Sequence, residues 1–495
     1  MRESIGLSIL VLAGIATQAY RYGFPASLNG PIGTWRRTQT AWGIRSMMRG
    51  SLNPLEAQVP VLGPPWKVPF EFPMYQWVSA VLGRLTGLDE VVAGRMVATL
   101  ALVATGVLTY YLGARLIAPA VGVVAATFIV LSPYGIHWGA EISIEYFTVA
   151  LSGGAFLAGR MWLLQGGRNA LVVYLVLAGL ASLSKLTTLV PWLVGLGVLA
   201  LFVQGRSGLP SVVWRVGVLG VALVPGVLWS RWADAVKADN PHAAPFVTSS
   251  MWAHNFGRLS DRVEMGTWQF LFRNVFDTTV GGAAVALILF VVAAARSECR
   301  RETAVLGSVA LAGPAIFASL YWAHPYYAVA IMPALTVLLA TGLVTAVQRL
   351  FAGSSPRAVR SAIVASFLGV TLLAATTPEG VELMNATLLR NRAATSAYDD
   401  IAEFTTPDDA LLVVSNVGWD PTLSFVTDRR MLMLFPSSDP NSSRPSDTEL
   451  GTTYRYAYWM GDAPSRDDWN EYLPATVELV PLSPKLYRIE AGSVG

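Results

Sequence analysis

The chain has 495 residues, of which 53% are hydrophobic and only 14% are charged, and its formal net charge is +3. Because a soluble protein of this size carries about a quarter charged residues, this composition indicates an integral membrane protein. The small net charge gives no reason to expect a nucleic-acid partner. The single cysteine, Cys299, excludes a disulfide framework and a cysteine-based metal motif.

Apolar runs close to the ~20 residues that span a bilayer recur through the first three quarters of the sequence. They predict eleven transmembrane helices, the first of them an uncleaved N-terminal helix because no clear cleavage site follows it. The two shortest runs flank Lys185, where residues 169–204 form either a hairpin or something less regular. The runs are 5–21, 92–112, 118–136, 143–164, 169–185, 187–204, 212–230, 278–295, 304–322, 326–347 and 361–377.

Arginine is distributed asymmetrically between the predicted loops, and this sets the expected orientation. If the N-terminus is cytoplasmic, every inner loop carries arginine, whereas the outer loops hold Asp, Glu, Trp and His as well. An odd number of spans then places the C-terminus outside. The inner-loop arginines are Arg115, Arg160, Arg168, Arg206, Arg215, Arg296, Arg300, Arg301, Arg349, Arg357 and Arg360.

Two of the predicted outer loops are long, at about 22–91 and about 231–277. The first contains "WKVPFEFPMYQWV", which leads into a segment whose apolar residues recur at i, i+3, i+4 and i+7. This pattern predicts a helix lying in the headgroup plane. "QTAWGIRSMMRG" is a weaker candidate for a second such helix. The apolar positions of the stronger one are Met74, Trp77, Val78, Val81, Leu82 and Leu85.

The composition changes near residue 379, and residues 379–495 contain 18 acidic and 9 basic residues. No spanning run follows, and strands are predicted at "DALLVVSN", "MLMLF", "YRYAYWM", "TVELVPL" and "LYRIE", with a turn and short helix in "GWDPTLSFVTDRR". We therefore expect a transmembrane domain over residues 1–378 and a small soluble α/β domain over 379–495 on the outer side.

Acidic and basic side chains gather in the segments predicted to lie at the outer membrane surface, where burying them is expensive unless they have a use. Such a set suits transfer of a group from a lipid phosphate. Cations can stabilise the departing phosphate, and a carboxylate can accept the proton of an incoming hydroxyl, which typically contributes ~10²–10⁴-fold in rate. The candidates include Arg36, Arg37, Lys67, Glu71, Glu141, Glu145, Lys185 and His324.

These residues also have plain structural interpretations. Glu71 fits a solvated loop residue beside Lys67, and Glu141 fits a residue that caps or begins the fourth span, favoured by the helix dipole. Glu145 lies a turn deeper, so we expect it to have an interior partner. Lys185 fits an interfacial anchor equally well. The arginine pair could bind headgroups without catalysis, and the "HPYY" stretch fits an aromatic belt.

Four stretches match features of one family when they are taken together. "PFEFPMYQWVSAVLGRLTGLDEVVAGRMVATL" is similar to its first-loop exit, and "LSPYGIHWGAEISIEYFTVAL" to the opening of its fourth span. "LASLSKLTTLVPWL" is similar to its lysine-bearing segment, and "HPYYAVAIMPALTVLLATGL" to its His-x-Tyr-Tyr signature. The chain thus resembles, over roughly residues 1–430, the GT-C membrane glycosyltransferases, in the branch of the protein O-mannosyltransferases and aminoarabinose lipid A transferases.

The resemblance implies eleven or more spans, a cavity at the outer leaflet, and transfer of a sugar from a polyprenyl phosphate to a hydroxyl with inversion. The acceptor would be a lipid, polysaccharide or protein, and a divalent cation is left open because only some members use one. The closest patterns are bacterial, which implies an inner membrane with the site and the C-terminal domain facing the periplasm. The residues that match the family's motifs are Glu71, Glu145, Lys185, His324 and Tyr327.

One departure from the family pattern concerns the early first-loop acid, its expected base. Residues 31–55 contain no acid, and Gln39 or the Arg36–Arg37 pair stands in that place. We therefore assign the base to Glu71, with Glu141 or Glu145 in support. Arg36, Arg37, Lys185 and Lys67 are assigned to the donor phosphate, and His324, Tyr327 and Gln39 to the substrate cavity.

Two other functions compete with this interpretation. A lipid or saccharide transporter is disfavoured because no paired repeats or matching interrupted spans are evident. A non-catalytic membrane partner that kept the fold after losing its early acid remains an alternative. The glycosyltransferase interpretation requires the assigned acids and cations to converge in one pocket on the outer face.

Overall fold

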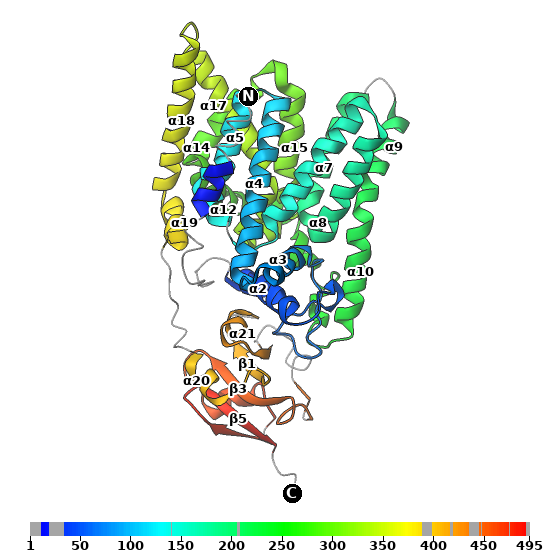
Figure 1. Ribbon diagram of the computed structural model, residues 1–495, viewed down its shortest axis with the longest axis vertical. Helices are drawn as coiled ribbons and strands as arrows, with labels where there is room; N and C mark the ends of the chain where they lie inside the picture. The colour runs from blue at the N-terminus through cyan, green and yellow to red at the C-terminus, as the bar shows by residue number, and fades with distance from the viewer. Residues whose placement is uncertain are drawn as a thin grey trace. The chain divides into compact units, whose positions relative to one another are not determined.

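The protein forms two compact units, a helical bundle and a smaller part built on a sheet (Figure 1). The first unit comprises Met1–Ala26, Val91–Trp229 and Trp252–Leu389. The second comprises Ser27–Glu90, Ser230–Met251 and Arg390–Gly495. The computed structural model describes residues 11–18, 34–139, 141–204, 208–388, 398–415, 419–434, 445–446, 448–474 and 476–491.

The first unit is built almost entirely from helices. Residues 11–18 are helical. The other elements are α4 (Glu90–Leu116), α5 (Pro119–Leu131), α6 (Pro133–Gly139), α7 (Glu145–Gln165), α8 (Arg168–Gln204), α9 (Leu209–Gly220), η2 (Val221–Leu223), α10 (Val224–Ala238), α11 (Trp252–Phe256), η4 (Ser260–Arg262), α12 (Met265–Phe272), η5 (Arg273–Asp277), α13 (Thr278–Val280), α14 (Ala283–Ala294), η6 (Ser297–Cys299), α15 (Arg300–Ile316), α16 (Ala318–Ala323), η7 (Pro325–Ile331), α17 (Met332–Leu350), α18 (Pro356–Thr376) and α19 (Pro378–Leu388). The first residue of α4, Glu90, and the part of α10 from Ser230 on belong to the second unit.

Among the described residues, six helices are long and apolar enough to cross a membrane, or eight if each of two bent pairs is one span. The predicted number of eleven is not confirmed. Most of the first predicted run lies outside the described residues, and α15 has only 17 residues. The two runs on either side of Lys185 form one element, α8, with a break inside it.

The break in α8 reverses the direction of the chain. Lys185 has extended backbone angles, with φ −168° and ψ 101°, between two helical halves. A methyl group added at Gly159 would lie 3.0 Å from the Tyr174 side chain and 2.8 Å from the Leu196 side chain. Tyr174 and Leu196 are equally far from Lys185 in sequence, on opposite sides, and in a straight helix they would be roughly 33 Å apart. Since both contact one glycine, α8 is a hairpin with Lys185 at its tip.

Helix α17 forms the core of the bundle. Every residue of the most apolar window of Pro325–Leu350, the span that joins η7 and α17, is buried, whereas the corresponding fractions are 17% for Leu209–Ala238 and for Pro356–Thr376. α17 packs against α5, α14 and α15, and α7 packs against α8. Gly342 of α17 allows the closest of these approaches, because an added methyl group there would lie 2.1 Å from the Leu289 carbonyl oxygen.

The second unit contains a five-stranded sheet in the order β2-β1-β3-β5-β4. β1 pairs in parallel with β2 and β3, while β5 pairs antiparallel with β3 and β4. All five predicted strands and the predicted short helix are confirmed. The elements of this unit are α2 (Thr34–Arg49), η1 (Pro54–Glu56), α3 (Met74–Thr86), η3 (Ala244–Phe246), α20 (Asp399–Phe404), β1 (Ala410–Ser415), α21 (Thr422–Thr427), β2 (Arg430–Leu434), β3 (Tyr454–Met460), α23 (Arg466–Asn470), β4 (Val477–Pro481) and β5 (Leu486–Ala491).

Part of the first loop completes this sheet. The backbone N–H of Met431 donates to the Pro60 carbonyl over 2.7 Å, and that of Met433 donates to the Val61 carbonyl over 3.1 Å. β2 is an edge strand, and these bonds satisfy donors that an uncovered edge would leave open. Val61 and Leu62 enter the same core as the buried sheet residues, so the first loop and the C-terminal segment fold together.

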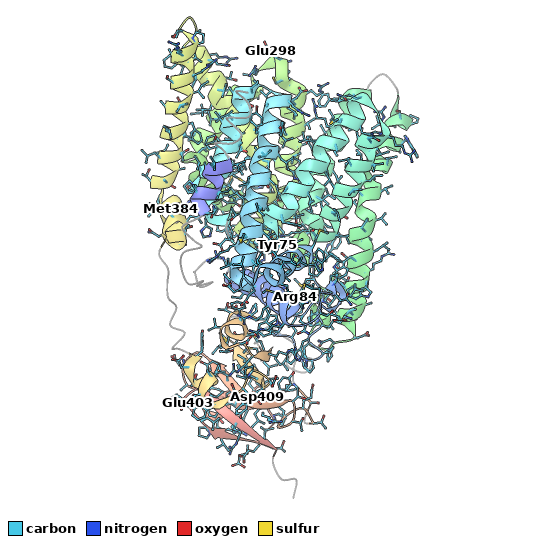
Figure 2. The ribbon with its side chains drawn as sticks, viewed as in Figure 1. Tyr75, Arg84, Glu298, Met384, Glu403 and Asp409 are labelled. Carbon is cyan, nitrogen blue, oxygen red and sulfur yellow. The ribbon has the colours of Figure 1, made fainter. Side chains whose placement is uncertain are left out.

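The two predicted first-loop helices, α2 and α3, are both present and pack on each other. Arg84 of α3 reaches the C-terminal end of α2, where it donates to the carbonyls of Met47 over 2.7 Å, of Met48 over 3.0 Å, and of Gly50 (Figure 2). A cation is favoured there because the last carbonyls of a helix lack intrahelical donors. Trp77 and Leu85, on the apolar face of α3, are exposed.

Candidate functional site

Glu145 begins helix α7 and is almost completely buried, with 2% of its surface exposed. A carboxylate in the first turn interacts favourably with the helix dipole, but its burial still requires a specific partner. Lys185 provides it: its Nζ donates to Glu145 Oε1 over 2.5 Å, and Lys185 is itself only 3% exposed. The interior partner expected for Glu145 is therefore present, and it comes from the tip of the α8 hairpin.

The ammonium group of Lys185 also faces aromatic rings of η7. Its Nζ lies 3.8 Å from the ring centroid of Tyr327 and 5.3 Å from that of Tyr326. An ammonium over the face of such a ring is attracted by the ring quadrupole, more strongly where water is excluded. Three residues predicted from separate stretches, Glu145, Lys185 and Tyr327, thus converge in the first unit.

Tyrosines that the sequence analysis did not single out surround this group. Tyr134 and Tyr321 both interact electrostatically with Glu145. The hydroxyl of Tyr134 donates to the Pro325 carbonyl over 2.9 Å, which ties α6 to η7. The second oxygen of Glu145, Oε2, is buried and accepts no hydrogen bond from the described residues. A tyrosine in "SPYG" or "LYWAH" carries no spacing signal, so the sequence could not distinguish these two from membrane-belt residues.

His324 lies beside the two tyrosines of η7 that face Lys185. Its ring stacks on Tyr326 and Tyr327, with centroids 5.3 Å and 5.8 Å away. The ring of His254, from α11, lies 5.6 Å from it. His324 is therefore adjacent to the Lys185 group.

Glu141 does not cap or begin a span, which corrects one sequence prediction. Helix α7 begins at Glu145 with Ile144 at its N-cap, and Glu141 lies between α6 and α7, where it is 7% exposed. Glu141 lies in the connection between the two helices, because α6 ends at Gly139 and α7 begins at Glu145. Nearby, His137 Nδ1 and the Thr387 hydroxyl are 2.7 Å apart, a buried contact that ties α6 to α19.

In the second unit, Arg36 of α2 joins two other predicted residues. Its guanidinium forms an ion pair and hydrogen bond with Glu71, and its Nη1 donates to Gln39 Oε1 over 3.0 Å. The Glu71 side chain is 29% exposed, so this carboxylate is accessible as well as paired. Glu71 is thus paired with Arg36 of α2. This helix lies in the segment where the family pattern has its early first-loop acid.

Arg37 and Lys67 occupy different positions in this unit. Arg37 is the next residue of α2 and is 7% exposed. Lys67 pairs with Gln58 through the backbone, and its Nζ lies 5.6 Å from the ring centroid of Trp232. Among the described residues Glu71 forms its ion pair with Arg36 and not with Lys67.

An apolar cavity of about 330 Å³ lies in the first unit between α12, η5, α14, α15, η7 and α17. Trp268, Phe276, Phe290 and Leu335 are among its lining residues, and Thr303 supplies a hydroxyl. None of the described lining residues is charged. A small neighbouring cleft shares Trp268 with it and reaches Tyr321. The sequence analysis did not identify these lining residues, because they are indistinguishable from those of an ordinary apolar span.

Within the described part of the chain, His, Cys, Asp and Glu side chains form no group of three or more that could hold a metal ion. The divalent cation left open by the resemblance therefore has no donor set among these residues.

Comparison with known proteins shows the fold. No family model and no curated protein sequence matches the chain. The structure of ArnT from Cupriavidus metallidurans bound to undecaprenyl phosphate matches with a TM-score of 0.64 and 16% identity, covering 98% of this chain and 97% of that one. That of AglB from Archaeoglobus fulgidus, an archaeal oligosaccharyltransferase in complex with an inhibitory peptide and a dolichol-phosphate, matches with a TM-score of 0.55 and 14% identity, covering 92% and 69%.

A further structure of the Archaeoglobus fulgidus oligosaccharyltransferase, in complex with Zn and sulfate, matches with a TM-score of 0.50 and 13% identity, covering 92% of this chain and 68% of that one. ArnT and AglB are membrane glycosyltransferases with the GT-C fold. This chain therefore has the GT-C fold, as the sequence resemblance predicts.

Proposed function

We propose that the protein is an inverting glycosyltransferase of the outer face of a bacterial inner membrane, and that it moves a sugar from a polyprenyl phosphate to a hydroxyl acceptor. The acceptor oxygen attacks the anomeric carbon as the bond from that carbon to the phosphate oxygen breaks. The polyprenyl phosphate leaves with the electron pair, and the acceptor proton passes to a carboxylate. The observation that carries this proposal is the convergence of Glu145, Lys185 and Tyr327 within a GT-C fold.

The chemistry of the Lys185 group supports a role at the leaving phosphate. A buried lysine kept in place by one carboxylate oxygen and one ring face has a fixed position, so it needs little reorganisation to stabilise developing negative charge. A buried ion pair is weak evidence for stability alone, since apolar replacements are often as stable. A functional reason for Glu145 and Lys185 is therefore the better explanation.

Glu71 is the proposed base, and Arg36 its partner. The paired arginine favours the ionised carboxylate, which is the form that can accept a proton. The same guanidinium could contact the donor phosphate, which would release the carboxylate as substrate enters. Arg37 is the neighbouring candidate for a phosphate contact, and Gln39, held by Arg36, is a candidate for contacts in the substrate cavity.

The apolar cavity supports a lipid-linked donor. A hydrocarbon chain gains about 25 cal/mol per Å² of apolar surface removed from water, and a lining without charged groups suits it. ArnT was solved with undecaprenyl phosphate and AglB with a dolichol-phosphate, so carriers of this class are the donors to test first.

The experiment is an assay of purified protein with sugar-labelled polyprenyl phosphates, comparing wild type with Glu71→Gln and Glu145→Gln. Loss of the base should lower the rate by ~10²–10⁴-fold. Glu403→Gln is the matched control, because Glu403 is an exposed carboxylate of α20 (Figure 2). Turnover that survives in both test variants would remove the assignment of catalysis to these carboxylates.

A non-catalytic membrane partner is the second candidate. The specific observation that favours it is the absence of an acid from residues 31–55, where Arg36 instead neutralises Glu71. A wild-type protein that binds donor lipid but is inert with many sugars and acceptors would favour this candidate.

A further inference from the structure

Helix α2 and residues 419–428 lie alongside each other within the second unit. At the N-terminal end, the rings of Trp35 and Trp419 are 5.4 Å apart. Further along, the hydroxyls of Thr38 and Thr422 are 3.3 Å apart. These contacts advance in the same direction along both segments, so the two run in parallel.

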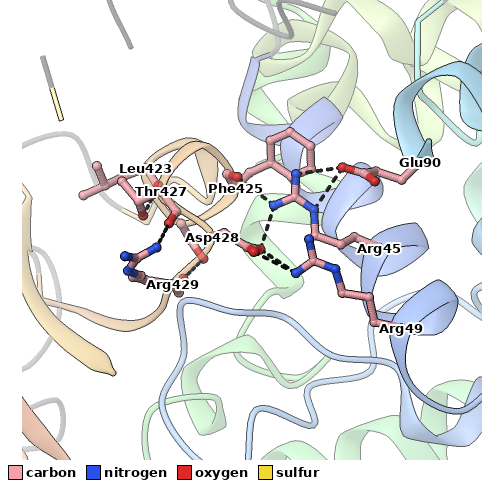
Figure 3. A network of polar contacts seen from close by, with 9 residues as sticks. Arg45, Arg49, Glu90, Leu423, Phe425, Thr427, Asp428 and Arg429 are labelled. Atoms are coloured by element: carbon pink, nitrogen blue, oxygen red, sulfur yellow. Dashed lines mark hydrogen bonds and ion pairs between the residues drawn. The ribbon is translucent and has the colours of Figure 1, made fainter. Parts of the chain in front are cut away.

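Near the C-terminal end of α2, ion pairs join the two segments (Figure 3). Arg45 Nη1 donates to the Phe425 carbonyl over 2.8 Å and to Asp428 Oδ1 over 3.0 Å. Arg49 Nη1 donates to both Asp428 oxygens, over 3.0 Å and 2.7 Å. The guanidinium of Arg45 also lies 3.9 Å from the Phe425 ring centroid. Two arginines of α2 therefore close on one carboxylate.

Asp428 lies between α21 and β2, next to a residue that is anchored to the C-cap of α20. It ends α21 in the left-handed region, with φ 58° and ψ 39°, a conformation that Asp and Asn adopt more readily than most residues. The next residue, Arg429, is buried and donates from Nε to the Thr405 hydroxyl over 3.0 Å and from Nη2 to the Thr405 carbonyl over 2.7 Å. The chain next to Asp428 is therefore anchored by contacts that do not involve α2.

Arg45 has a second anchor on its other side. Its Nε and Nη2 donate to Glu90 Oε1 over 3.0 Å and 2.7 Å, and the Arg45 side chain is 12% exposed. Charge-assisted hydrogen bonds of this kind are shorter and stronger than neutral ones. The C-terminal half of α2 is thus fixed by two carboxylates from distant parts of the sequence.

We propose that Asp428 is a positioning residue, and that residues 419–428 set the placement of α2 and hence of Arg36 and Gln39, which α2 carries. The helix is a rigid rod over this length, so a shift at Arg45 and Arg49 is transmitted to its first turns. The C-terminal domain then acts through α2 on the donor-phosphate contacts. This inference rests on the proposed function for its catalytic consequence, but its structural part does not.

The test uses the full-length protein with Asp428→Asn, which keeps the side-chain shape and tolerates the left-handed backbone. Hydrogen exchange of peptides from residues 34–49 should quicken about tenfold, since a bond to a charged group is lost. The KM for labelled polyprenyl-phosphate sugar should rise by a similar factor. Glu403→Gln should change neither quantity.

A second variant distinguishes a loss of α2 positioning from a general loss of stability. In an Arg45→Gln, Arg49→Gln background, adding Asp428→Asn should cause no further change, because its partners are already absent. Unchanged exchange over residues 34–49 in Asp428→Asn would overturn the proposal, as would faster exchange with an unchanged KM. If wild type transfers no sugar, the proposed function fails, and the exchange result still decides whether Asp428 holds α2.

Discussion

Lys185 and Glu145 form a buried ion pair, with Nζ 2.5 Å from Oε1 and both side chains 3% exposed. The two residues come from the tip of the α8 hairpin and from the first turn of α7. Desolvating two charges costs several kcal/mol per ion, and their mutual attraction offsets this only in good geometry. The pair therefore makes the stability of the bundle and the proposed chemistry depend on the same two side chains.

Replacing Lys185 with Met should destabilise the bundle by about 3–5 kcal/mol, because Glu145 would remain buried without its cation. SDS titration of the folded fraction in mixed micelles measures this. The double variant Lys185→Met, Glu145→Leu should recover much of the lost stability, since no charge is left buried, but should recover no sugar transfer. Recovery of transfer in the double variant would contradict the role proposed for the pair.

Tyr327 should contribute through its ring face. Tyr327→Phe keeps a ring 3.8 Å from Lys185 Nζ and should leave the folded fraction nearly unchanged. Tyr327→Leu removes it and should cost about 1–2 kcal/mol, the range for a desolvated cation–π contact. The same SDS titration compares the two variants. Equal losses in both would mean that the hydroxyl, and not the ring, is the important group.

Local patterns predicted much of the secondary structure in advance. The alternation and apolar content of "DALLVVSN" and "YRYAYWM" were sufficient to predict β1 and β3, because strand signals are contained within a few residues. The isolated charge of Lys185 between two apolar runs indicated an interruption there but left open whether the chain forms a hairpin, and the structure shows the break at Lys185. The resemblance of four stretches extended this to the GT-C fold, which composition alone does not specify.

Long-range pairings could not be predicted. Arg45 and Asp428 are 383 residues apart, and no periodicity relates them. The pairing of Pro60 and Val61 with the edge of β2 carries no sequence signal either, because it uses backbone groups that every residue has. The sequence identified Glu145 and Lys185 as candidates, and only the fold shows that they form an ion pair.

Gly342 should tolerate no side chain. An added methyl group would lie 2.1 Å from the Leu289 carbonyl oxygen. Neither the Gly342 backbone in α17 nor the Leu289 backbone in α14 can move independently of its helix. Gly342→Ala should therefore destabilise the bundle by about 1–3 kcal/mol, the usual cost of overpacking. Gly197→Ala is the control, because nothing lies within 4 Å of its added methyl group. If Gly197→Ala proved as damaging, the contact between α14 and α17 would not be the cause.

The contribution of Asp428 should depend on pH. Burial alone would raise the pKa of Asp428, but hydrogen bonds from Arg49 and Arg45 and their positive charges outweigh it and lower the pKa. A carboxyl whose pKa is lower in the folded state stabilises that state fully above its unfolded pKa of about 3.9, and this contribution is lost as the pH falls through the folded value.

Wild type should thus exceed Asp428→Asn in resistance to proteolysis of residues 27–90 at pH 6–7. The difference should shrink as the pH is lowered below ~4, towards the folded pKa. A difference that is constant from pH 7 to pH 3 would show that the carboxylate charge does not hold α2.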